Sequence, residues 1–131
     1  MILALDASAA AEVVLARPKA RFMGKAIEEA EWVLAPDLFV AELSNVLWKC
    51  HALAGMEAEE CATRTEAGIL LVDDFVPSGE LWREALAEAA KSGHPVYDLL
   101  YLVVARRNGA ALATCDRRRR ELAKKLKVGL V

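Results

Sequence analysis

The chain has 131 residues, of which 56% are hydrophobic and 27% charged, so we expect one folded domain over residues 1–131 and exclude a disordered chain. The formal net charge is −2, but residues 106–131 hold nine basic side chains against two acidic ones. A basic last quarter on an acidic body suits a protein that holds phosphates and cations in different places, and a solvated basic helix explains the charge equally well.

Neither end of the chain nor its cysteines indicate export. The apolar start has no basic residues before it and is interrupted by Asp6, unlike a signal peptide. No stretch approaches the roughly 18 uncharged apolar residues that span a bilayer. Three cysteines without a paired C-x-x-C spacing argue against a disulfide scaffold or a zinc ribbon. We therefore expect a cytoplasmic protein.

Short apolar runs alternate with helical patterns along the chain. Strands are predicted at residues 2–6, 33–35 and 110–114, with 128–130 as a further candidate. Helices are predicted after the first strand up to residue 17 and at residues 20–32, 38–53, 58–71, 78–92, 97–107 and 117–126. This order predicts an α/β fold, a three-layer α/β/α sandwich around a short, mostly parallel sheet. In such sheets the functional site lies beyond the carboxyl ends of the strands.

Two acidic residues stand at such strand ends. Asp6 and Asp116 each follow a predicted strand and precede a helix. Each one alone is explained equally well as a helix N-cap. Because parallel strands far apart in the sequence can be neighbours in the sheet, the pair also fits a shared site.

Two further acids lie on apolar helices. Glu42 shares a helix face with Leu38 and Val46, where a glutamate needs a cation or hydrogen-bond donors unless it reaches water. Asp98 begins a nearly continuous apolar helix, either as an N-cap or as a carboxylate facing a cleft. Both placements favour a partner for the charge.

The four carboxylates together point to a hard cation. Mg²⁺ and Mn²⁺ prefer oxygen ligands, and such ions can activate a water for attack on a phosphodiester. A metal-free ribonuclease would need a general acid–base pair, typically histidines, but His51 lies within a predicted helix and His94 in a loop before a proline. The residues therefore favour a metal-dependent nuclease.

Four ordered motifs carry a family resemblance: L-D-A-S at 5–8, A-E-L-S-N-V-L at 41–47, Y-D-L-L-Y-L-V-V-A-R at 97–106 and T-C-D-R-R at 114–118. With them the chain resembles PIN-domain ribonucleases of the VapC type, the toxins of toxin–antitoxin pairs. The resemblance implies a PIN-like fold and a Mg²⁺-dependent endoribonuclease that hydrolyses RNA with a metal-activated water. It also implies a homodimer silenced by a small antitoxin.

The resemblance also implies roles for individual residues. The catalytic and metal-binding acids are Asp6, Glu42, Asp98 and Asp116, of which Asp116 matches the most variable family position. Ser8 and Thr114 match small hydroxyl positions near the metal. From their charge, we expect Arg117, Arg118 and Lys124 to contact RNA phosphates.

Two other functions stay open at this point. A receiver-like signalling domain has a similar length and pattern, but it needs paired acids after the first strand and a lysine after the last core strand. Here Asp6 stands alone, and Arg117 follows Asp116. A non-catalytic interaction module with the PIN fold is the second alternative.

Overall fold

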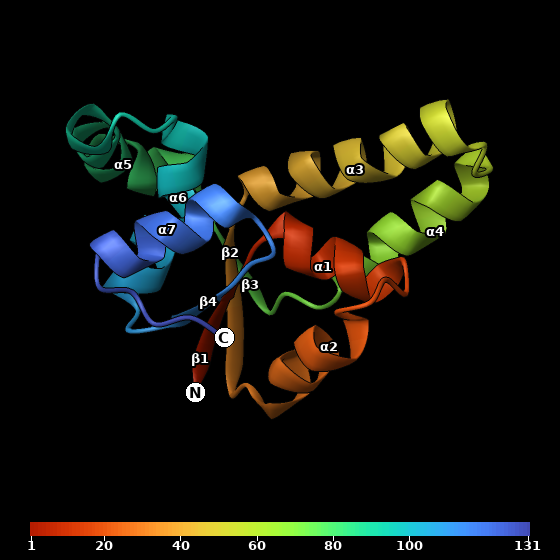
Figure 1. The fold of residues 1–131 in the computed structure, drawn as a ribbon, viewed down its shortest axis with the longest axis horizontal. Helices are drawn as coiled ribbons and strands as arrows, with labels where there is room; N and C mark the ends of the chain where they lie inside the picture. Colours follow the sequence, from red (N-terminus) through yellow and green to blue (C-terminus); the bar gives the residue numbers. More distant parts are fainter.

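Four short strands form one parallel sheet at the centre of the molecule, as seen in the computed structural model of residues 1–131 (Figure 1). The strand order is β3-β2-β1-β4. The strands are β1 (Ile2–Leu5), β2 (Trp32–Pro36), β3 (Asp74–Val76) and β4 (Ala111–Ala113). In the central strand, Leu3 lies opposite Val33 on one side and Ala111 on the other. The short apolar runs are therefore strands buried on both faces, as parallel sheets require.

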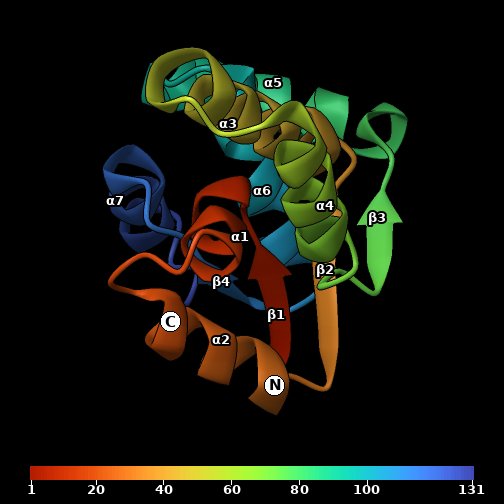
Figure 2. The ribbon, with the colours of Figure 1, turned by 90° about the vertical axis from the view of Figure 1, so that its right-hand side faces the viewer.

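Helices cover both faces of this sheet. They are α1 (Ala7–Val14), α2 (Ala20–Glu29), α3 (Leu38–Ala54), α4 (Ala58–Ile69), α5 (Ser78–Ser92), α6 (Val96–Arg107) and α7 (Arg117–Lys125). Figures 1 and 2 show α1, α2 and α4 on one side and α5, α6 and α7 on the other. The three-layer α/β/α fold predicted from the sequence is thus confirmed. None of these helices combines the length and the apolar character needed to cross a membrane.

The core is densest around α6, because every residue from Asp98 to Ala105 is buried. This explains why its sequence is almost continuously apolar and not amphipathic. On the other side of the sheet, α3 and α4 approach closely at Gly68, where an added Cβ would lie 2.4 Å from a methyl carbon of Leu43. A side chain at position 68 would therefore require the Leu43 side chain to move.

Three sequence predictions of elements were wrong in detail. The helix predicted for residues 20–32 ends at Glu29, because Trp32 already belongs to β2. β3 was not predicted, since a three-residue strand is too short to show an alternating pattern. The candidate strand at 128–130 is reduced to a single bridge between Leu130 and Leu112.

Candidate active site

The site begins where β1 and β4 end side by side. The backbone N–H of Asp6 donates to the carbonyl of Ala113 at 3.1 Å, which continues the strand pairing by one residue. The Asp6 side chain is fully buried and caps α1 by accepting from the N–H of Ala9 at 3.1 Å. The cap that the sequence suggested for Asp6 therefore exists, and it leaves the second carboxylate oxygen facing the strand ends.

Two hydroxyl groups hold the Asp6 carboxylate in place. Ser8 donates to Oδ1 at 2.5 Å, and Thr114 donates to Oδ2 at 2.5 Å. The same hydroxyls accept backbone N–H groups of the connection after β4: Ser8 from Cys115 at 2.8 Å and Thr114 from Asp116 at 3.0 Å. Ser8 and Thr114 therefore fix the carboxylate and also fasten the start of α7 to the start of α1.

A buried arginine lies at the centre of the acids. The Arg119 guanidinium donates to Asp98 Oδ1 at 2.9 Å, to Asp6 Oδ2 at 3.2 Å and to the two oxygens of Glu42 at 3.1 and 2.9 Å. It also lies over the Tyr101 ring, 4.5 Å from the centroid, while the Tyr101 hydroxyl donates to Glu42 at 2.7 Å. Only 8% of the Arg119 side chain is exposed. The structure thus brings three of the four predicted acids together around one guanidinium.

The pKa values of three groups in this cluster, Asp6, Arg119 and Tyr101, are all raised. Burial raises the pKa of the Asp6 carboxyl, and the charge of Arg119 with the hydroxyl hydrogen bonds offsets this only in part. Burial disfavours the charged form of Arg119, but the hydrogen bonds to Glu42 and the charges of Asp6 and Glu42 outweigh it and raise the pKa of Arg119. Burial, followed by the charge of Glu42, raises the pKa of Tyr101. Arg119 is therefore charged and Tyr101 is a hydrogen-bond donor throughout the physiological range.

One acid oxygen in the cluster has no hydrogen bond. Asp98 is not the N-cap of α6, because that helix begins after Pro95 and places Asp98 within its first turn. Its Oδ1 binds Arg119, but its buried Oδ2 accepts nothing and lies 3.6 Å from Nη2 of Arg118, too far for a hydrogen bond. A buried carboxylate oxygen without a partner is costly, so this atom is suited to a cation.

Asp116, the fourth predicted acid, has a structural role in α7. It is the N-cap of that helix and accepts from the backbone N–H of Arg119 at 3.0 Å. Together with Ser8, Glu42 and Arg119 it lines a groove of about 300 Å³ between α1, α3 and α7. Asp116 therefore borders the cluster without binding the guanidinium.

The side chains predicted to contact RNA lie on the outer face of α7. The Arg117 side chain is 93% exposed and lies 3.6 Å from Glu121, while that of Arg118 is 61% exposed. Lys124 is exposed on the last turn. These three cations face solvent, and none of them lines the groove.

Sequence reasoning missed Arg119 and Tyr101, although both follow helical spacing. Arg119 is three residues before the buried Leu122 and four before the buried Ala123, which places it on the inner face of α7. Tyr101 is three residues after Asp98 on α6. Helix phase could therefore have separated Arg119 from the three other arginines in the run 117–120.

The three carboxylates are suitable ligands for a magnesium ion, but their arrangement in this structure does not form a metal site. Carboxylate oxygens from Asp6, Glu42 and Asp98 are the ligands that Mg²⁺ prefers, and Asp98 Oδ2 accepts no hydrogen bond. Nevertheless, no three His, Cys, Asp or Glu side chains gather closely enough to hold a metal ion. The Arg119 guanidinium lies between the three carboxylates and forms ion pairs with each of them.

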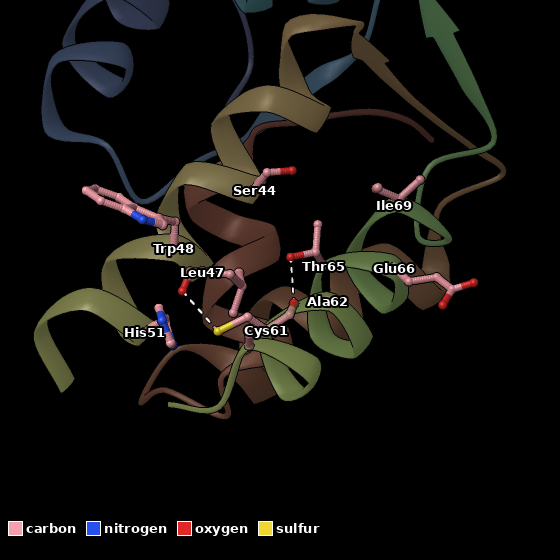
Figure 3. Close-up of a pocket in the computed structure, with 10 residues that line it drawn as sticks. Ser44, Leu47, Trp48, His51, Cys61, Ala62, Thr65, Glu66 and Ile69 are labelled. Carbon is pink, nitrogen blue, oxygen red and sulfur yellow. Dashed lines mark hydrogen bonds between the residues drawn. The ribbon is translucent and has the colours of Figure 1, made fainter. Parts of the chain in front are cut away.

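A mostly apolar groove of about 500 Å³ lies elsewhere, between α3 and α4. Figure 3 shows Leu47, Trp48 and His51 facing Cys61 across this groove. The Cys61 thiol donates to the Leu47 carbonyl at 3.2 Å, so it is part of the helix packing. This groove contains none of the four predicted acids.

Comparison with known proteins gives one family. The model of the PIN domain family matches residues 3–125. Ribonuclease VapC3 from Pyrobaculum aerophilum is 32% identical to this chain over 123 residues, which cover 89% of this chain and 91% of that protein.

Solved structures show the same fold. PAE2754 from Pyrobaculum aerophilum has a TM-score of 0.72 at 24% identity, with 91% of this chain and 77% of that chain covered. VapC20 from Mycobacterium tuberculosis, a sarcin–ricin loop cleaving toxin, has a TM-score of 0.66 at 13% identity, covering 92% and 94%. VapBC2 from Rickettsia felis, bound to a DNA fragment from its promoter, has a TM-score of 0.65 at 14% identity, covering 100% and 98%.

Proposed function

Because this chain belongs to the PIN-domain family and groups with its VapC-type ribonuclease toxins, we propose that it is a metal-dependent endoribonuclease of a toxin–antitoxin pair. The observation that carries the proposal is the convergence of Asp6, Glu42 and Asp98 at the carboxyl edge of the sheet. Family membership leaves the receiver-like alternative without support.

In this proposal Asp6, Glu42 and Asp98 hold Mg²⁺ or Mn²⁺, and Asp116 holds a second ion or orients the attacking water. When bound, the ion supplies a Lewis acid that lowers the pKa of water and offsets charge at the scissile phosphate. Ser8 and Thr114 keep the Asp6 oxygens in place through their 2.5 Å hydrogen bonds. These hydroxyls act by positioning the carboxylate.

In this proposal the RNA substrate contacts the outer face of α7. Arg117, Arg118 and Lys124 are exposed on α7, the helix that contributes Arg119 to the groove. A cation contacts RNA phosphates without reading the bases, so these side chains would set affinity and leave the choice of RNA to its shape.

We also propose a small antitoxin as the partner of this chain and a homodimer as its assembly. A VapBC structure among the neighbours supports the antitoxin. Trp82 and Leu86 support a second copy, since these exposed apolar side chains lie one turn apart on α5. Light scattering of the purified chain tests the dimer, and a mass of one chain would contradict it.

The experiment that tests the activity is incubation of the purified full chain with total RNA in Mg²⁺, in Mn²⁺ and in EDTA. We expect cleavage with either ion and none in EDTA. The Asp98→Asn variant keeps the side-chain volume but removes the charge, and it should not cut. Equal cleavage by this variant and the wild type would rule out the carboxylate site. Absence of cleavage by the wild type in both ions would instead favour the non-catalytic interaction module.

A further inference from the structure

We propose that Arg119 is a resident cation that competes with the divalent ion for the acid cluster, so that metal binds only when the guanidinium withdraws. The inference rests on the proposed function in one respect: it takes Asp6, Glu42 and Asp98 as the metal-binding acids.

The contacts show that the guanidinium and a metal ion need the same atoms. Three nitrogens of Arg119 bind all three acids, at Asp6 Oδ2, Asp98 Oδ1 and both oxygens of Glu42, over distances of 2.9 to 3.2 Å. An ion that bound these oxygens would draw them to about 2.0–2.1 Å and would leave no room for a guanidinium among them. Occupancy by one cation therefore excludes the other.

Charge explains why a cation must be present in either state. Three carboxylates in a largely buried cluster repel one another and lose their hydration, which costs several kcal/mol per uncompensated ion. Arg119 supplies one positive charge and rests on the face of Tyr101, an additional favourable contact for a guanidinium. Arg118 also lies 3.6 Å from Asp98, and two arginines facing three acids still leave an excess of negative charge that a divalent ion can offset.

The fold also gives the guanidinium a way out. Arg119 lines the groove between α1, α3 and α7 together with Asp116 and Glu42. Its backbone stays fixed, because its N–H donates to the Asp116 cap at the start of α7. The side chain can therefore withdraw into the groove by rotating its own bonds, without unwinding the helix.

The direct test is calorimetric titration of the metal-free full chain with Mn²⁺, comparing the wild type with Arg119→Gln. Removal of the competing guanidinium should tighten Mn²⁺ binding by roughly 10- to 150-fold, the equivalent of losing one hydrogen bond to a charged group that must otherwise be broken. Lys125→Gln is the matched control: it removes one positive charge from the exposed face of the same helix. Screening by solvent and salt should keep its effect within about twofold.

Each outcome decides the inference. Tighter binding by Arg119→Gln alone supports competition. Equal affinity for Arg119→Gln and the wild type, equal tightening by both variants, or absence of Mn²⁺ binding in all three proteins overturns it. If Arg119→Gln does not fold without metal, Arg119→Lys replaces it. The lysine keeps the charge but lacks the fork that binds three acids, so Mn²⁺ should again bind more tightly, and unchanged affinity would overturn the inference.

RNA cleavage separates this inference from the proposed function. A wild type that cuts RNA in Mn²⁺ while Arg119→Gln binds the ion no better keeps the ribonuclease and overturns competition. Conversely, tighter Mn²⁺ binding by Arg119→Gln, with no cleavage by either protein, supports competition and contradicts the ribonuclease.

Discussion

The molecule contains two arginine–carboxylate clusters that differ mainly in their access to water. Between α5 and α6, Arg106 lies 2.6 Å from Glu84 and 3.0 Å from Glu88, with 35% of its side chain exposed. In the acid cluster, Arg119 makes contacts of similar length with 8% of its side chain exposed. Arginine–carboxylate contacts of similar length therefore occur once at the surface and once in the interior.

The pKa of Glu84 in one cluster and the pKa of Asp6 in the other are shifted in opposite directions. Hydrogen bonds from Arg106 and Arg107 lower the pKa of Glu84 because burial opposes them only weakly. At Asp6 burial dominates and raises the pKa despite the adjacent Arg119. Forming the surface cluster requires little desolvation of its charged groups. The buried cluster loses more hydration free energy, and its excess of acids can bind another cation.

The largest difference should appear in catalysis. Asp98→Asn removes a buried acid and should lower RNA cleavage in Mg²⁺ by about 100-fold or more, since even residues that only support a metal ligand are worth 10- to 100-fold. Glu84→Gln, in the surface cluster, should cut at the wild-type rate. Gel-based cleavage rates measure both, and similar losses in the two variants would show that the effect is one of stability.

The second largest difference should be in the stability of the metal-free protein, when Arg119 and Arg106 are each substituted. Arg119→Gln removes the guanidinium that contacts three acids, two of which are buried, and should lower the free energy of unfolding by about 3 kcal/mol. Arg106→Gln should lower it by less than about 1 kcal/mol, because solvent takes over the charges. Urea unfolding in EDTA measures both values. Equal losses would mean that burial does not distinguish the clusters.

The pH dependence of the surface cluster should be smaller still. Because the folded state lowers the pKa of Glu84 below its ordinary value of 4.5, the ionised form stabilises the fold. This contribution is fully present above pH 4.5 and is lost as the pH falls through the folded-state pKa. Glu84→Gln should therefore be less stable than the wild type at pH 7, by less than about 1 kcal/mol. Urea unfolding at several pH values should show this gap closing in acid, and a gap that stays constant would contradict the assignment.

The smallest expected effect concerns a single exposed cation. Added salt should weaken RNA binding, and Arg117→Gln should reduce the log–log salt slope by about 0.7, the value for one phosphate contact on a single strand. Binding of a labelled RNA to the inactive Asp98→Asn protein, with and without the second substitution, measures the slope. An unchanged slope would place Arg117 outside the RNA path.

Local patterns in the sequence were enough to predict three of the four strands and the three acids that gather around Arg119. Asp6 follows from the rule that parallel strands end at a common edge, and Glu42 from its position in an apolar stripe. Asp98 was ambiguous, because a first-turn acid and an N-cap look alike in sequence. The structure resolves this by starting α6 after Pro95.

What could not be predicted depends on packing between distant segments. Helix phase could have singled out Arg119 among the four arginines at 117–120, but no local pattern reveals which distant acids its guanidinium contacts. Likewise, no local pattern reveals that Asp98 Oδ2 lacks a partner. The most informative features of the site therefore came from tertiary structure.

The hydrogen bond from Thr114 to Asp6 joins residues 108 positions apart, and this has a consequence during synthesis. A ribosome makes Asp6 first, and that carboxylate must wait for β4 and α7 before Thr114 and Arg119 can reach it. A nascent chain in which β4 and α7 have not yet emerged from the ribosome holds its acids without their hydroxyl and guanidinium partners. The hydroxyl and guanidinium contacts of Asp6 therefore form only when nearly the whole chain has been synthesised.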